Sequence, residues 1–158
     1  MRRSTLVCSL ALALLGGAPL AGCSFTRAPS TTLAEARVVQ STDDAVVVEF
    51  TLSAENPNED PLPLRSIRYT LTLDGKTVFT GTRSPEATIR PNSTQLFRVP
   101  APIRLDPADR SREHAYTLAG SITYVEPGTF SRILFDADVI QPSASFSTSG
   151  QIRLDAAP

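Results

Sequence analysis

The stretch VVVEFTLSAE, residues 46–55, places an apolar side chain at every second position. The alternating apolar residues are Val46, Val48, Phe50, Leu52 and Ala54. Successive side chains of a strand point to opposite faces of a sheet, whereas a helix needs apolar residues three and four positions apart. The stretch therefore predicts a long strand with one buried and one solvated face.

A hairpin is predicted on the C-terminal side of this strand. Residues 67–73 alternate in the same way, Asp74-Gly75 follows at once, and residues 76–82 resume an extended pattern. Asp-Gly between alternating segments favours a type I′ turn, in which both central residues need positive φ. Two strands joined by this turn are therefore expected.

A third alternating run, residues 97–105, contains Pro100 and Pro102. Proline cannot donate a ladder hydrogen bond, so this run is predicted to be an edge strand or to leave the sheet there. Further strands are predicted at residues 116–124, 133–139 and 152–154, with a Ser-rich loop at residues 142–150.

The fold class follows from the order of these segments. Only residues 106–114 carry helix signals, an acid followed by proline, and they are long enough for about two turns. Strands separated by turns, without helices between them, exclude a parallel sheet with crossover helices. The expected fold is all-β, a small antiparallel β-sandwich of about seven strands with at most one short helix.

The N-terminal residues have the features of a secretory leader. Two arginines precede a short apolar run, and small residues then lead to Cys23. A cysteine at the cleavage point resembles the lipobox of bacterial lipoproteins, in which this residue is acylated and becomes the new N-terminus. We expect a signal peptide at residues 1–22, a lipidated N-terminus and flexible tether at 23–33, and one folded domain at 34–158. In the alternative, an ordinary secreted protein, Cys23 is incidental.

The leader also predicts where the protein is located. The expected location is the bacterial cell envelope, with the membrane bound through the lipid on Cys23. By analogy with the sorting of Gram-negative lipoproteins, Ser24 favours the periplasmic face of the outer membrane. The only other cysteine, Cys8, lies in the leader, so no disulfide is expected in the processed chain. A net charge of −1 gives no attraction to nucleic acid.

Groups that could support catalysis are few. A nucleophilic hydrolase needs a histidine base, and the single histidine, His114, lies in a polar segment where a solvated surface position is expected. Asp136 and Asp138 would lie on one face of a predicted strand, where they could share a calcium ion, although such pairs are usually the wet face of a strand. We expect no enzymatic activity, no metal and no cofactor.

The pattern F-x-L-x-x-x-N-P-N-x-x-P-L-P-L-x-x-I-x-Y-x-L-x-L-x-G begins at Phe50 and ends at Gly75. It resembles the late embryogenesis abundant type 2 family, also called the water-stress and hypersensitive-response domain. The resemblance extends over residues 36–155. It implies a sandwich akin to fibronectin type III and immunoglobulin domains. It also implies stress protection in plants and envelope functions in bacterial lipoproteins.

The centre of this pattern, Asn56-Pro57-Asn58, has a physical interpretation of its own. Pro57 biases Asn56 toward extended geometry, and Asn58 can close an Asx-type turn with its side chain. A structural corner is therefore predicted, with ligand binding by the amides as the alternative.

Two binding roles remain open at this stage. The first is a non-enzymatic lipoprotein that protects or binds other molecules, with an envelope protein as a partner. The second is a carrier of lipid or another apolar ligand beside the proline-containing edge, at Phe97, Val99, Ile103 and Leu105. The alternative role for these four side chains is to fill the core.

Overall fold

The computed structural model describes residues 26–104, 106 and 109–155. They form eight strands and one helix: β1 (Ser30–Ser41), β2 (Ala45–Asn56), β3 (Leu62–Leu73), β4 (Lys76–Arg83), β5 (Thr88–Ile89), β6 (Ser93–Arg104), β7 (Glu113–Tyr124), α1 (Thr129–Asp136) and β8 (Ser143–Arg153). The predicted all-β class with one short helix is confirmed, although the helix lies elsewhere in the chain than expected.

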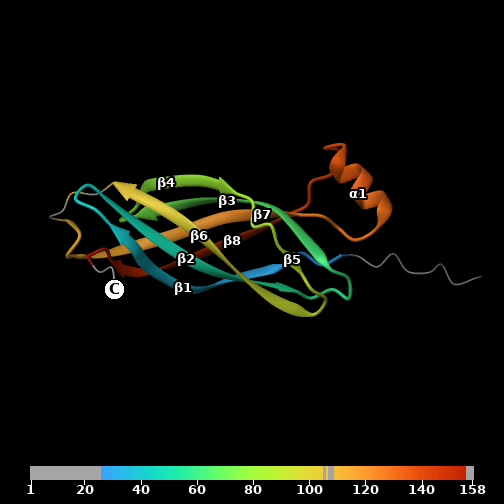
Figure 1. Cartoon of the computed structure of the whole chain (residues 1–158), viewed down its shortest axis with the longest axis horizontal. Helices are drawn as coiled ribbons and strands as arrows, with labels where there is room; N and C mark the ends of the chain where they lie inside the picture. The colour runs from blue at the N-terminus through green and yellow to red at the C-terminus, as the bar shows by residue number, and fades with distance from the viewer. Residues whose placement is uncertain (1–25, 105, 107–108, 156–158) are drawn as a thin grey trace, which may run out of the picture.

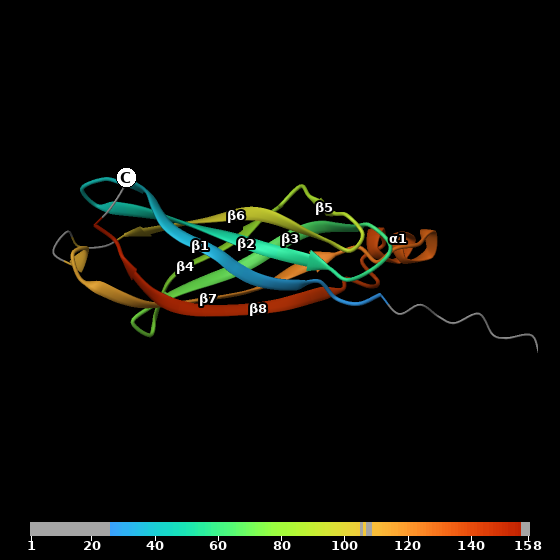
Figure 2. The same ribbon diagram turned by 90° about the horizontal axis from the view of Figure 1, so that it is seen from below.

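The strands form two antiparallel sheets that face each other along the long axis of the molecule (Figure 1, Figure 2). One sheet has the order β1-β2-β6, and the other has the order β4-β3-β7-β8 with β5 paired to β3. Figure 1 shows α1 beyond one end of the sheets, at the same end as the start of the described chain. The molecule is therefore an elongated sandwich with two distinct ends.

The core lies between the sheets and follows the predicted alternation. All five apolar residues of the opening stretch are buried, with Phe50 and Leu52 fully so. β3 and β7 supply the opposite layer through Ile67, Leu71 and Ile122. Burial of a side chain of this size stabilises a fold by about 1.5–3 kcal/mol, so this apolar layer is the main source of stability.

Two local predictions are confirmed at the strand ends. Asp74 and Gly75 both have positive φ, 48° and 81°, in the turn between β3 and β4. Pro100 and Pro102 lie in β6, which is an edge strand paired only with β2 among the described residues. Both results follow from local backbone chemistry, the positive φ that the turn needs and the hydrogen-bond donor that proline lacks.

Strand β1 was not predicted, and it begins at Ser30, inside the segment expected to be a tether. Its register against β2 shifts between Leu33 and Glu35 and again between Val38 and Gln40. Each bulge changes which face the next residue occupies, so the apolar alternation is lost in the sequence.

Strand β8 was predicted much too short, because residues 142–150 were expected to be a loop. Ala144 and Phe146 point inward and serines occupy the outer face. The Phe146 ring covers Gly120 of β7, where an added Cβ would come within 2.7 Å of it. The serines of residues 142–150 therefore lie on the solvent-exposed face of β8 and do not indicate a loop.

The helix was predicted in the wrong segment, and a strand was predicted where the helix lies. Residues 133–139 were expected to be a strand, but α1 contains most of them and begins after Gly128, which has φ 110°. Phe130, Ile133 and Leu134 have the spacing of one helical face. The same segment also fits the pattern of an apolar strand, and the strand was predicted. Residues 106–114 were expected to be a helix, but β7 begins at Glu113.

Candidate functional site

The Asn56-Pro57-Asn58 signature lies at the corner between β2 and β3. Its Asx-type turn is made by the side chain of Asn56 and not, as expected, by that of Asn58. Asn56 is fully buried, and its Oδ1 accepts hydrogen bonds from the Asn58 backbone N–H at 3.0 Å and from Asn58 Nδ2 at 2.8 Å. This is an Asx-type turn in which the side chain takes the role of a backbone acceptor. The Asn56 amide is therefore occupied by the fold and is not presented to a ligand.

The same amide joins the two sheets. Asn56 Nδ2 donates to the carbonyl oxygens of Asp60 at 2.8 Å, Ile89 at 3.2 Å and Arg90 at 3.2 Å. Asn56 ends β2 in one sheet, whereas Ile89 lies in β5, which pairs with the other sheet. A buried polar group with all its partners present specifies one arrangement, so the corner fixes how the sheets meet.

Asn58 extends the corner to the start of the described chain. The backbone N–H of Arg27 donates to Asn58 Oδ1 at 2.8 Å, and Asn58 Nδ2 donates to the Arg27 carbonyl at 2.8 Å. Arg27, Asn58 and Pro127 line one cavity of about 310 Å³, and Pro127 precedes α1. The corner thus holds the N-terminal segment beside the helix, and we call this end of the sandwich the corner end.

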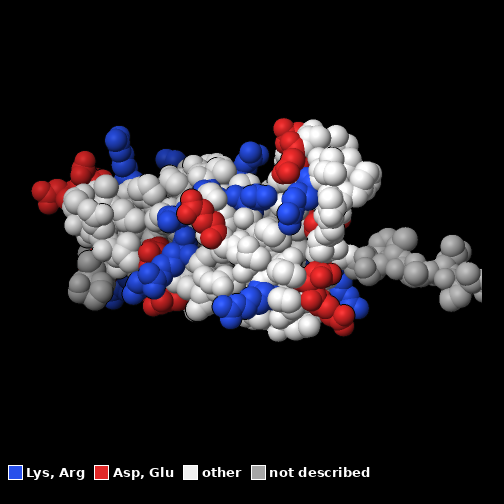
Figure 3. Space-filling view, turned by 45° about the vertical axis from the view of Figure 1, so that its right-hand side comes forward, with Lys and Arg blue, Asp and Glu red and all other residues white. Residues whose placement is uncertain are grey.

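Helix α1 and the residues after it form a lobe at the corner end. No residue of α1 is buried, and large exposed apolar side chains are Phe130, Ile133, Val139 and Ile140. We call residues 128–140 the α1 lobe. In Figure 3 its outer face is largely white, and charged side chains lie on one side of it. The alternating apolar residues of 133–139 indicated an ordinary strand, so this surface was not expected.

The residues predicted as an apolar-ligand edge lie mainly in the core. Phe97, Val99 and Ile103 point inward from β6 and are buried, and Leu105 lies outside the described residues. Tyr69 of β3 donates to the Pro100 carbonyl at 2.5 Å, which links this edge to the opposite sheet. Burial raises the pKa of the Tyr69 hydroxyl, so it stays a donor at neutral pH. Cys23 also lies outside the described residues.

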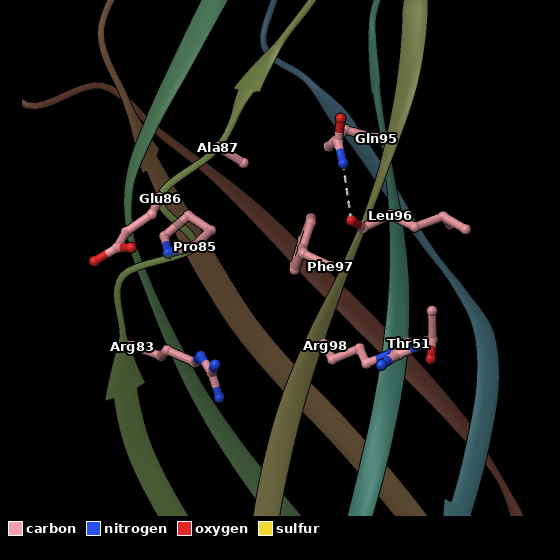
Figure 4. Close-up of a pocket in the computed structure, with 9 residues that line it drawn as sticks. All are labelled: Thr51, Arg83, Pro85, Glu86, Ala87, Gln95, Leu96, Phe97 and Arg98. Carbon is pink, nitrogen blue, oxygen red and sulfur yellow. Dashed lines mark hydrogen bonds between the residues drawn. The ribbon is translucent and has the colours of Figure 1, made fainter.

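A groove of about 500 Å³ runs beside β6, between it and the segment after β4 (Figure 4). Arg83 and Glu86 line the β4 side, and Leu96, Phe97 and Arg98 line the β6 side. Leu96 is exposed, whereas Phe97 is buried at the edge of the core. The lining is mixed in character, with two arginines around a small apolar floor, and it suits an amphiphilic or anionic ligand better than a purely apolar one.

His114 is buried in β7, so the expectation of a solvated surface histidine was wrong. It continues the inward series of Tyr116 and Leu118 at every second residue. Its Nδ1 lies 2.8 Å from Asp74 Oδ2 and its Nε2 lies 2.7 Å from the Asp109 carbonyl. Both ring nitrogens therefore hold the fold together, and neither is presented to a substrate.

Asp74 is the centre of a charged cluster at the opposite end, which we call the hairpin end. Its Oδ1 accepts the Ala115 N–H at 3.0 Å, and Arg112 Nη1 lies 3.0 Å from Oδ2. The hydrogen bond with His114 contributes most to lowering the pKa of the Asp74 carboxyl below its usual value. This cluster stabilises the hairpin.

Asp136 and Asp138 do not form the expected pair on a strand. Asp136 ends α1, and Asp138 follows it with a positive φ of 55° and accepts a hydrogen bond from Gln141. Within the part of the chain that the structure describes, no group of three or more histidine, cysteine or acidic residues is arranged to hold a metal ion. No helix among the same residues is long and apolar enough to cross a bilayer.

The family model of the late embryogenesis abundant protein family (LEA_2) matches residues 51–138. The chain belongs to this family. The matched region includes the corner, the groove, His114 and α1, but it excludes β1 and β8. The resemblance read from the sequence is therefore confirmed at the level of the family.

Solved structures support the LEA_2 fold. The solution structure of an Arabidopsis thaliana protein superposes with a TM-score of 0.63 at 14% identity, covering 82% of this chain and 84% of that one. The solution structure of a late embryogenesis abundant protein gives a TM-score of 0.61 at 22% identity, covering 80% of this chain and 71% of that one. At these identities the similarity concerns the fold. No curated protein sequence matches this chain significantly.

Proposed function

We propose that this LEA_2 protein is a non-enzymatic lipoprotein of the bacterial cell envelope that protects neighbouring molecules during water stress. The family match over residues 51–138 is the observation that carries the protective role. The lipobox sequence ending at Cys23 supports the anchor, and Ser24 favours the periplasmic face of the outer membrane. The assignment of His114 and Asp74 to the fold agrees with a protein that carries out no chemistry.

Survival after drying tests the protective role. A host strain that lacks the gene is complemented with the wild-type protein or with Cys23→Ser. We expect normal growth in rich medium, lower survival of the deletion strain after drying or osmotic shock, and rescue by the wild-type protein. Equal survival of parent and deletion strain would overturn the protective role.

Cell fractionation tests the anchor separately. The wild-type chain should be found in the membrane fraction with an acylated N-terminus at Cys23, and Cys23→Ser should be unprocessed or released. Unaltered mass and membrane partitioning of Cys23→Ser would contradict the lipid anchor. This outcome would leave the family and the fold unchanged.

The groove between β4 and β6 favours a second candidate, binding of an amphiphile. Its volume of about 500 Å³ suits a small ligand, and Arg83 could pair with an anionic head group. Arg98 could add a second contact, although its Nε also lies 3.6 Å from Glu49 Oε1. Native mass spectrometry of the protein purified from its host should then show a co-purified ligand that Arg83→Ala with Arg98→Ala removes. A spectrum of the protein alone would argue against this role.

A further inference from the structure

The α1 lobe concentrates the exposed apolar surface of the molecule. Six large hydrophobic side chains are exposed in the part of the chain that the structure describes, and four of them lie in this lobe. Phe130 is 72% exposed and Val139 is 66% exposed. Single exposed apolar residues are common on soluble domains, whereas a cluster of them indicates a surface that contacts something apolar.

The exposed apolar residues and the charged residues of the helix lie on different sides of it. Phe130 and Ile133 lie on one side of the helix by their spacing and are exposed, whereas Leu134 is half-buried and lines a small cavity against the body. Arg132 and Asp136 lie on the side away from Leu134 and are exposed. Phe135 is turned to the body of the protein, where the Arg65 guanidinium lies 5.8 Å from its ring centroid. The outer surface of the lobe therefore combines the apolar Phe130 and Ile133 with neighbouring charged side chains, which lie on one side of the lobe (Figure 3).

The corner brings this lobe close to the expected anchor. Arg27 is hydrogen-bonded to Asn58 in both directions, and Cys23 lies four residues before Arg27 in the sequence. Four residues span at most about 14 Å. Pro127, which borders the same cavity as Arg27, is followed directly by the lobe. An acyl chain on Cys23 would thus hold the lobe within reach of the bilayer surface.

We propose that the α1 lobe docks onto the phospholipid bilayer that holds the lipid on Cys23, with Phe130 and Ile133 inserted at the boundary between head groups and acyl chains. The proposal rests on the proposed function, because the anchor supplies the bilayer. An eight-residue helix is too short to bind a membrane strongly alone, but a short tether raises its effective concentration at the surface to about the millimolar range.

The charges of the lobe favour apolar insertion over attraction to anionic lipid. Arg132 is offset by Asp136 and Asp138 in the same segment. A lobe that bound through head-group charge would carry an excess of lysine or arginine. We therefore expect docking on zwitterionic vesicles as well as on anionic ones.

The chain has no tryptophan, so a single introduced tryptophan reports on one site. Phe130→Trp places the reporter on the lobe, and Val39→Trp is the matched control on an exposed apolar position of β1. Each protein is purified from membranes and reconstituted in vesicles of phosphatidylethanolamine and phosphatidylglycerol, with or without bromine on the acyl chains. Thermal unfolding of both variants confirms that they fold as the wild type does.

Bromine should quench the Phe130→Trp emission at least about twofold and leave Val39→Trp almost unchanged, because only the lobe meets the acyl chains. Repetition on phosphatidylcholine vesicles should give the same result. Equal, weak quenching of the two reporters would overturn the proposal. A blue shift at residue 130 without quenching would also overturn it, since it would assign the lobe to a second copy or another protein.

A chemical anchor separates this proposal from the proposed function. Cys23 is the only cysteine of residues 23–158, so a maleimide lipid can be attached there without cellular acylation. If cells do not acylate Cys23 but the lipid conjugate of Phe130→Trp is quenched, the envelope function fails and the membrane affinity of the lobe stands. If cells acylate Cys23 and the lobe is not quenched, only the docking proposal fails.

Discussion

The two ends of the sandwich each bury one polar side chain, and the chemistry of the two differs. Asn56 at the corner end and His114 at the hairpin end are the buried polar residues of the described chain. The Asn56 amide is neutral and its partners are backbone groups and the neutral Asn58 side chain, whereas His114 lies against the Asp74 carboxylate. The hydrogen bonds of Asn56 at the corner end therefore involve no group that titrates, whereas the hairpin end depends on the Asp74 carboxylate, which does.

The surfaces of the two ends also differ in polarity. The corner end exposes the apolar α1 lobe, whereas the hairpin end exposes the Arg112 and Asp109 ion pair. Arg110 also joins the hairpin end to the β1–β2 turn through the carbonyl oxygens of Thr42 and Asp43. The proposed position next to a membrane concerns the corner end, which carries the apolar lobe and holds the segment around Arg27.

The largest effect should come from the corner. Asn56→Ala removes the donors to three carbonyl groups and the acceptor of the Asx turn, in a position with no solvent access. Unpaired buried polar groups and a cavity together should lower the free energy of unfolding by about 2–4 kcal/mol. Urea denaturation of the two proteins measures the difference.

Gln95→Ala is the matched control for this change. Gln95 is an exposed amide whose Nε2 donates to the adjacent Leu96 carbonyl. Its loss should change the free energy of unfolding by less than about 0.5 kcal/mol. Similar destabilisation by both changes would show that the corner has no special role in joining the sheets.

The next effect concerns pH and belongs to the hairpin end. The folded protein lowers the pKa of Asp74, so the stability that Asp74 contributes is present above its unfolded pKa of about 3.9 and is lost as the pH falls through the lower folded value. Asp74→Asn keeps a turn-forming Asn-Gly pair but removes the charge. The variant should be less stable at pH 7, with a weaker loss of stability below about pH 4.

Urea denaturation at pH 7 and at several values below pH 4 provides the test. A double variant with His114→Gln should show that the two effects are not additive, since the residues share a hydrogen bond. Parallel pH profiles for the wild type and Asp74→Asn would refute the assigned role of the carboxylate.

The sequence predicted those features that a single backbone requirement determines. Alternation in residues 46–55 predicted β2, and Asp74-Gly75 predicted the hairpin. The two prolines predicted that β6 is an edge strand or leaves the sheet, and it is an edge strand. Each of these rests on local geometry. The bulges of β1 depend on its partner strand and cannot be read from residues 30–41 alone.

The candidate site was predicted only in part for the same reason. The sequence indicated a corner at Asn56, but the carbonyl groups that its amide joins come from Ile89 and Arg90, more than 30 residues away. His114 was judged by its polar neighbours, although its spacing from Tyr116 and Leu118 placed it on the inward face. The apolar residues after Gly128 fitted both strand and helix periods, and only the fold decides between them.

A smaller effect is expected from Asn58, which holds the N-terminal segment. Asn58→Ala removes two exposed hydrogen bonds to Arg27 and one to Asn56, and should lower stability by about 1 kcal/mol. Trypsin should then cleave faster after Arg27 in the native protein, because the segment opens locally. Unaltered cleavage would indicate that other contacts, such as the buried Pro29, hold this segment.

The smallest effect on stability is expected in the α1 lobe. Phe130 is 72% exposed and Ile133 is 57% exposed, so Phe130→Ser with Ile133→Ser removes much less buried surface than a change in the core. The free energy of unfolding should change by less than about 0.5 kcal/mol, measured in urea without membranes. A loss as large as that of Asn56→Ala would mean that the lobe packs on the body of the protein. An unchanged stability would mean that these apolar side chains are retained on the surface at no benefit to the fold, as expected for residues that serve a contact outside the molecule.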